Sequence, residues 1–243
     1  MAELKRPGGE LASRPLHFFW IVDCSGSMYG DKIGAVNHAI QSTVPDMRDA
    51  AKNNPNAQLL IRTLKFASGA SWITTNPVDV ENFAWDDLDA GGVTDLGAAF
   101  DLLAAQLTIP PMTDRALPPV LVLLSDGQPT DNYKKSLDKL LQLPWGRKSV
   151  RIAIAIGQDA DEDLLAQFTG NREVVLHANN RDALVKMIKW ASTAASQVSA
   201  PASRAQEATP ASSNESSGDS NAPLVLDMNN IPDPNSVGAK DVW

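Results

Sequence analysis

The chain is short of cysteine, and Cys24 is the only one among its 243 residues. A single thiol cannot form an internal disulfide, and it cannot build a zinc site from cysteine ligands. Because chains without disulfides are typical of reducing compartments, we expect a cytoplasmic protein.

Long hydrophobic runs are also missing. The longest one, Val120 to Leu124, is far shorter than the roughly 20 apolar residues that a membrane-spanning helix needs. Residues 1–14 contain Lys5 and Arg6 but no apolar stretch after them, so we expect a flexible N-terminal segment rather than a secretory signal. We therefore expect no membrane partner.

Positive charge is in short supply. The sequence has 21 Lys and Arg residues against 29 Asp and Glu residues, which gives a net charge of −8. This balance argues against nucleic acid or an anionic membrane surface as the main partner. Cations and basic surfaces are the more natural partners.

The motifs of several common catalysts are absent as well. The chain has no GxxxxGK[ST] phosphate-binding loop. Asp23 follows a strand, as in haloacid-dehalogenase-type phosphatases, but Ser25 replaces their second aspartate. Cys24 lacks the arginine that a tyrosine-phosphatase loop needs six positions later, where Gly30 stands. No histidine is placed to activate Ser25 or Ser27, so we expect a non-enzymatic protein.

What the sequence does contain is a regular alternation of strands and helices. Short apolar runs predict buried strands, and apolar residues at helical spacing predict amphipathic helices between them. Such an alternation predicts an α/β fold with a parallel sheet between helices, and a hairpin at the sheet edge. We expect strands at 18–22, 59–66, 72–74, 118–124, 150–157 and 173–177, and helices at 32–52, 98–107, 133–143, 161–168 and 181–196.

The composition changes after residue 198. Residues 199–243 are rich in Ser, Pro and Ala and more acidic than basic, which is typical of a disordered tail. Apolar islands at Leu224 to Met228 and Val242-Trp243 leave open a peptide that docks on this chain or on a partner. We therefore divide the chain into a domain at 15–198 and an acidic tail at 199–243.

Polar side chains gather where two predicted strands end and in one loop between them. Asp23, Ser25 and Ser27 follow the first strand, and Asp126 follows the strand at 118–124. Thr94 lies in a glycine-rich loop before a helix. Ligands of open α/β sheets bind outside the carboxyl ends of the strands, so we expect these side chains to form one site.

All five side chains offer oxygen atoms, which are the ligands that hard cations prefer. Mg²⁺ binds six oxygens at about 2.0–2.1 Å and usually keeps water in part of its shell. Two carboxylates would neutralise such an ion, and three hydroxyls would supply neutral donors. The sequence therefore predicts a Mg²⁺ site, with Mn²⁺ or Ca²⁺ as alternatives, made of Asp23, Ser25, Ser27, Thr94 and Asp126.

Two further aspartates stand close to these motifs. Asp95 follows Thr94, and we expect it to cap the next helix. Asp131 is expected to form a turn through Pro129. Neither is assigned to the metal.

These motifs resemble the metal-ion-dependent adhesion site of von Willebrand factor A (VWA) domains. Asp23 to Ser27 matches the DxSxS motif, Thr94 matches the threonine loop, and Asp126-Gly127 matches the final aspartate. The resemblance covers about residues 15–196 and implies a Rossmann-like three-layer α/β/α fold. Its central sheet would have about six strands, mostly parallel, with one antiparallel edge strand. The resemblance also implies a non-enzymatic interaction module in which a partner's Asp or Glu binds the ion.

Within this family, the chain is similar to the bacterial TerY-like proteins of tellurium-resistance and chemical-stress gene clusters. The similarity lies in Leu124 to Tyr133, Ala155 to Asp161 and Ile188 to Ser192. It implies a stress-response or defence assembly with a protein kinase and a phosphatase. Two other interpretations remain open: a metal-dependent hydrolase that uses the same ion to activate water, and a scaffold that acts without metal through its tail.

Overall fold

The computed structural model describes residues 13–54, 56–199 and 231. Its centre is a seven-stranded sheet with the order β3-β2-β1-β5-β6-β7, in which β4 also pairs with β2. The strands are β1 (Arg14–Asp23), β2 (Ala57–Ala67), β3 (Gly69–Trp72), β4 (Val78–Asp79), β5 (Val120–Ser125), β6 (Val150–Ile156) and β7 (Val175–Ala178). The helices are α1 (Asp31–Lys52), α2 (Leu96–Gln106), α3 (Tyr133–Gln142), α4 (Pro144–Lys148), α5 (Glu162–Thr169) and α6 (Arg181–Ser199), with 3-10 turns η1 (Gly26–Met28) and η2 (Arg172–Val174).

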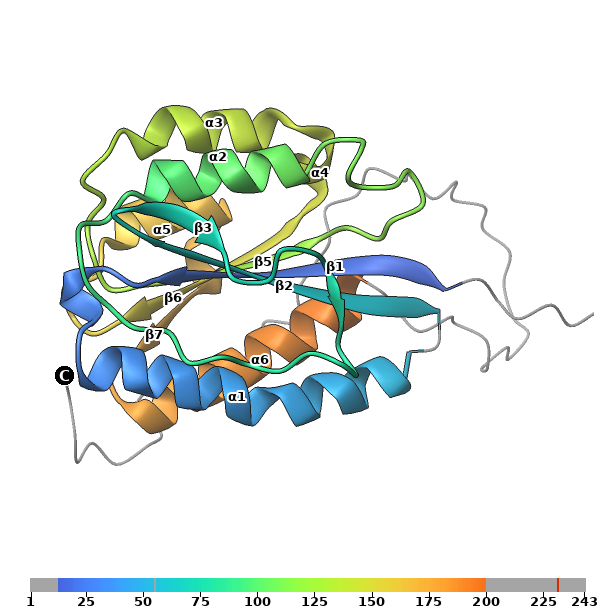
Figure 1. Ribbon diagram of the computed structural model, residues 1–243, viewed down its shortest axis with the longest axis horizontal. Helices are drawn as coiled ribbons and strands as arrows, with labels where there is room; N and C mark the ends of the chain where they lie inside the picture. The colour runs from blue at the N-terminus through green and yellow to red at the C-terminus, as the bar shows by residue number, and fades with distance from the viewer. Residues whose placement is uncertain (1–12, 55, 200–230, 232–243) are drawn as a thin grey trace, which may run out of the picture.

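The helices lie on both faces of this sheet and give three layers. Figure 1 shows α1 and α6 below the sheet and α2, α3 and α5 above it. Strands β2, β1, β5, β6 and β7 are parallel, whereas β3 and β4 run antiparallel to β2. The expected three-layer fold with an antiparallel edge strand is therefore confirmed.

Strand β1 lies in the middle of the sheet, and its burial explains its almost continuous hydrophobicity. Phe18, Trp20 and Val22 pack into the core cluster on the side of α1 and α6. Phe19 and Ile21 pack into the cluster on the side of α2, α3 and α5. Because successive side chains of a strand point to opposite faces, a strand covered on both faces needs apolar residues at every position.

Some elements differ from the sequence prediction. Strand β4 has two residues and the helix α4 has five, and neither was predicted. The first strand begins at Arg14 rather than near residue 18, because it pairs along its whole length with β2. The last helix continues to Ser199, past its expected end at 196.

The predicted terminal segments lie largely outside the described residues. This holds for residues 1–12 of the N-terminal segment and for the tail at 200–230 and 232–243, including both apolar islands. Ile231 is described, and it packs, partly buried, against the core cluster of α1 and α6. Within the described ranges, none of the helices combines the length and the apolar character needed to cross a bilayer.

Candidate metal centre

Asp23 and Asp126 come together because β1 and β5 are neighbouring parallel strands. Val22 pairs with Leu124 in the sheet, so both strands end at the same edge. Asp23 is the last residue of β1, and Asp126 follows the last residue of β5. Their exposed fractions are 0% and 3%. Two buried carboxylates at one place need compensation by hydrogen bonds or by a cation.

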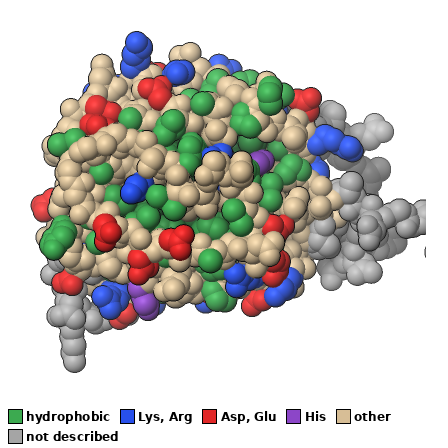
Figure 2. All heavy atoms as spheres, viewed as in Figure 1, with side chains coloured by type: hydrophobic (Ala, Val, Ile, Leu, Met, Phe, Trp, Pro, Cys, Tyr) green, Lys and Arg blue, Asp and Glu red, His purple; other side chains and the backbone are tan. Residues whose placement is uncertain are grey.

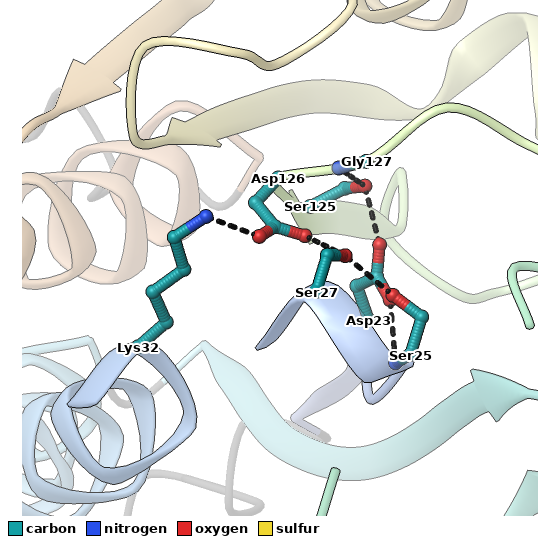
Figure 3. A network of polar contacts seen from close by, with 7 residues as sticks. All are labelled: Asp23, Ser25, Ser27, Lys32, Ser125, Asp126 and Gly127. Carbon is teal, nitrogen blue, oxygen red and sulfur yellow. Dashed lines mark hydrogen bonds and ion pairs between the residues drawn. The ribbon is translucent and has the colours of Figure 1, made fainter. Parts of the chain in front are cut away.

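The turn η1 brings two hydroxyls between these carboxylates, as Figure 3 shows. The Ser25 backbone N–H donates to Asp23 Oδ1 at 2.8 Å, which curls the chain back over the strand end. Ser25 Oγ lies 3.0 Å from Ser27 Oγ, and Ser27 Oγ donates to Asp126 Oδ1 at 2.7 Å. Four of the five predicted ligands therefore form one hydrogen-bonded chain.

Thr94 reaches the same place because its loop is bonded to the loop after β1. The Gly26 N–H donates to the Gly92 carbonyl at 3.0 Å, and the Gly91 N–H donates to the Cys24 carbonyl at 2.8 Å. The Thr94 side chain is buried, with 7% of the residue exposed. Its hydroxyl has no hydrogen-bond partner among the described residues, so its lone pairs remain available to an ion.

The position of Gly127 shows that the donors converge. A Cβ atom there would lie 3.3 Å from Ser27 Oγ and 3.7 Å from both Asp23 Oδ2 and Thr94 Oγ1. Asp23 and Ser27 come from the end of β1 and the turn after it, Thr94 comes from the loop before α2, and Gly127 itself follows Asp126, so three segments meet at this point. Since the donors are carboxylates and hydroxyls, the cradle fits a hard divalent cation. No cluster of three or more His, Cys, Asp or Glu side chains suited to a metal occurs in the described part of the chain, so such a site depends on its hydroxyls.

Burial dominates the electrostatics of this site. It raises the pKa of Asp23, and the nearby charge of Asp126 raises it further, against hydrogen bonds from Ser125 and Ser25 that lower it. The Ser125 hydroxyl donates to Asp23 Oδ2 at 2.6 Å. The pKa of the Cys24 thiol is raised to about 12, first by burial and then by the charge of Asp23. Burial in the core cluster beside α1 therefore makes the Cys24 thiol a poor nucleophile.

Two side chains at the site were not found by sequence reasoning. The Lys32 ammonium forms an ion pair with Asp126 Oδ2. Ser125, the last residue of β5, holds Asp23 as described above. A lysine early in a helix and a serine at the end of a strand are common in many sequences, so neither carried a specific signal.

The two neighbouring aspartates have other roles than the ones expected of them. Asp95 occupies the N-cap position of α2 without capping it, and its carboxylate accepts from the Gly69 N–H at 2.7 Å and from Thr130 Oγ1 at 3.2 Å. Asp131 caps the helix instead, accepting from the Gly97 N–H at 3.1 Å and the Ala98 N–H at 3.2 Å. The expectation for Asp95 was wrong because its side chain is drawn to the turn before β3.

Comparisons with known proteins place this geometry in a family. No protein of curated function matches the sequence. Among solved structures, a von Willebrand factor type A protein from Catenulispora acidiphila matches at 15% identity with a TM-score of 0.54, over 75% of this chain and 43% of that one. Proximal thread matrix protein 1 from the mussel byssus, solved with a zinc-occupied MIDAS motif, matches at 16% identity and 0.53, over 75% and 47%. The manganese-loaded TRAP protein of Plasmodium vivax matches at 18% identity and 0.53, over 74% of each chain.

At these identities the solved structures show a shared fold, and this chain spans less than half the length of the first two. The sequence profile of the von Willebrand factor type A domain matches residues 19–190, which is most of the chain. That range contains both strand ends, the turn η1 and the Thr94 loop. The chain therefore belongs to the von Willebrand factor type A domain family.

Proposed function

We propose that this domain is a metal-dependent protein-interaction module. Asp23, Ser25, Ser27, Thr94 and Asp126 would hold a divalent cation, with Mg²⁺ as the preferred ion. The observation that carries the proposal is the convergence of the Asp23, Ser27 and Thr94 oxygens on Gly127, the residue that follows Asp126. The zinc-occupied MIDAS motif of one structure of this fold, and the manganese-loaded state of another, support a divalent ion in this domain.

The partner would supply an Asp or Glu side chain to the bound cation. Five protein ligands leave room in an octahedral shell for a sixth, and the ion provides the Lewis-acid attraction for an incoming carboxylate. Tyr29 and Val93 lie beside the ligand loops and are 79% and 48% exposed. Large apolar side chains at such exposure are candidates for contact with residues that flank the partner's carboxylate.

An interaction role is supported over hydrolysis by the positions of the histidines. His17 lies in β1, six residues before Asp23 and buried. His177 lies on β7, the edge strand, and its Nδ1 is 3.7 Å from Glu162 Oε1. His38 is exposed on α1. None of the three histidines belongs to the hydrogen-bonded chain in Figure 3, so none is placed to act as a base for a metal-bound water.

The cellular compartment and the assembly of this module are proposed from the sequence similarity to TerY-like proteins. We place the module in the cytoplasm of a bacterium, in a tellurium-resistance, stress-response or defence assembly with a kinase and a phosphatase. Figure 2 shows acidic and basic side chains interspersed over the face in view, with no continuous basic patch among the described residues there. That surface supports a protein partner over nucleic acid.

The test is a pull-down from a bacterial lysate with Mg²⁺, with chelator, and with the Asp23→Ala variant. Asp101→Ala is the matched control, because this aspartate is exposed and pairs with Lys139 on the far side of α2 from the core. We expect recovery of the partner only with Mg²⁺ and only with an intact Asp23. Equal recovery under all conditions would contradict recognition through a metal.

A further inference from the structure

Lys32 is the charged residue of the site that the five expected ligands do not include. It is the second residue of α1, and its ammonium pairs with Asp126 Oδ2. The other oxygen of Asp126 accepts from Ser27, so both carboxylate oxygens have partners (Figure 3). Asp23, in contrast, is held by two hydrogen bonds from neutral groups.

The burial of this pair sets it apart from the other lysine ion pairs of the described residues. The exposed fractions of the side chains are 19% for Lys32 and 0% for Asp126. In the pair of Lys139 with Asp101 they are 63% and 52%. Exposed pairs are screened by solvent and contribute little, whereas a pair in which the carboxylate is fully buried is screened much less.

We propose that Lys32 sets the charge of the metal site and thereby selects the partner. This inference rests on the proposed metal-dependent function. Two aspartates and one lysine sum to −1, so the site with a divalent cation carries +1. Without Lys32 the same loaded site would be neutral. A charge of +1 matches one carboxylate, which is the chemistry of a single Asp or Glu side chain.

The same charge has opposite effects on the two ligands. Lys32 repels the cation and competes for the electron density of Asp126, so it weakens the hold on the metal. The ion that does bind is less neutralised and attracts a carboxylate more strongly. Lys32 therefore lowers the affinity for the metal and raises the affinity of the metal-loaded site for the partner. If Lys32 only stabilised the fold, its removal would not strengthen metal binding while weakening partner binding.

The experiment compares Lys32→Met, which keeps the length of the side chain without its charge, with Lys32→Arg, which keeps the charge. Lys139→Met is the control for loss of a lysine ion pair at an exposed position. Mn²⁺ affinity is measured by calorimetry. Acetate binding to the Mn²⁺-loaded protein is then measured by water-proton relaxation, because acetate displaces a coordinated water. Circular dichroism shows whether each variant is folded.

For Lys32→Met we expect Mn²⁺ binding about tenfold tighter and acetate binding several-fold weaker, the sizes of a partly screened unit charge. Lys32→Arg and Lys139→Met should stay near the wild type in both. If wild type binds Mn²⁺ and Lys32→Met matches it in both affinities, or shifts both in the same direction, the inference about Lys32 is wrong while the metal site stands. If folded wild type binds no Mn²⁺, the proposed function is overturned, and this inference with it.

Discussion

Asp131→Ala should weaken both the fold and the metal site, because Asp131 fixes the start of α2 from a different loop. Its two carboxylate oxygens accept from the N–H groups of Gly97 and Ala98 at 3.1 and 3.2 Å. N–H groups in the first turn of a helix have no partner within the helix. Thr94 lies two residues before α2, and its carbonyl accepts from the Thr130 N–H at 2.8 Å. Loss of the cap therefore loosens the segment that carries one metal ligand.

The expected magnitude follows from the two hydrogen bonds and the charge. Loss of a capping side chain costs about 0.5–2 kcal/mol, and an acidic group at a helix N-terminus adds roughly 0.3–1 kcal/mol. Since Asp131 is only partly buried, we expect a loss of about 1.5 kcal/mol, or a fall in Tm of about 3–6 °C for a domain of this size. Urea and thermal unfolding measure this loss. Asp131→Asn, which keeps an acceptor without the charge, should lose less.

A double-mutant cycle with Gly97 tests the contact itself. A Cβ atom at Gly97 would lie 2.8 Å from Asp131 Oδ2 and 3.1 Å from the Cα atom of Tyr133. Gly97→Ala should therefore destabilise the wild type, and it should destabilise the Asp131→Ala background clearly less. Coupling between touching residues is typically about 0.5–3 kcal/mol. Strictly additive effects, or an Asp131→Ala variant as stable as the wild type, would refute this reasoning.

Three further predictions concern Gly127, the buried His17, and the exposed apolar residues Tyr29 and Val93. Gly127→Ala places a methyl group among the ligand oxygens, so we expect at least tenfold weaker Mn²⁺ binding at an almost unchanged Tm in chelator; full affinity would contradict the convergence described above. Burial, and then a nearby guanidinium, lowers the pKa of His17 to about 4 from 6.5. Between pH 6.5 and 4 the unfolded chain binds a proton at His17 and the native state does not, so the free energy of unfolding should fall by up to about 3 kcal/mol. In urea unfolding, His17→Leu should reduce this dependence of stability on pH. An unchanged pH dependence would contradict the role of His17. Tyr29→Ser and Val93→Ser should lower partner recovery at unchanged Mn²⁺ affinity. Ile109→Ser should not, because Ile109 is exposed beyond the other end of α2. Equal loss of recovery in all three variants would rule out a specific contact of the partner with Tyr29 and Val93.

The parts of the fold that were predicted are those with a strong local pattern. The run from Phe18 to Val22 shows a strand buried on both faces, and the apolar spacing after Lys32 shows α1. Strand β4 has two residues, which are too few to show a periodicity. It forms because it pairs with Leu60 and Ile61 of β2. Such an element is decided by tertiary pairing, which a local pattern does not contain.

The same distinction applies to the candidate site. Asp23, Ser25 and Ser27 lie within one short motif, and Asp126 repeats the arrangement of a strand followed by an acid, so their meeting could be predicted. Lys32 acts on a residue 94 positions away, and Asp131 on a helix 34 positions before it. Those contacts depend on how the loops are arranged in three dimensions, and single residues in the sequence do not encode them visibly.

The two-sided packing of β1 has a consequence for the choice of ion. Alternate residues of this strand are fixed in opposite helical layers, so the strand end that carries Asp23 cannot shift without disturbing both. Packed interiors resist such displacement. In the proposed metal site the position of the Asp23 carboxylate would therefore be fixed, and an ion would have to match that position in its radius. Mg²⁺, with oxygen distances of about 2.0–2.1 Å, and Ca²⁺, with about 2.3–2.6 Å, differ enough in size for such a rigid ligand to distinguish them. Size selection at the surface of this domain would thus originate in the hydrophobic core beneath it.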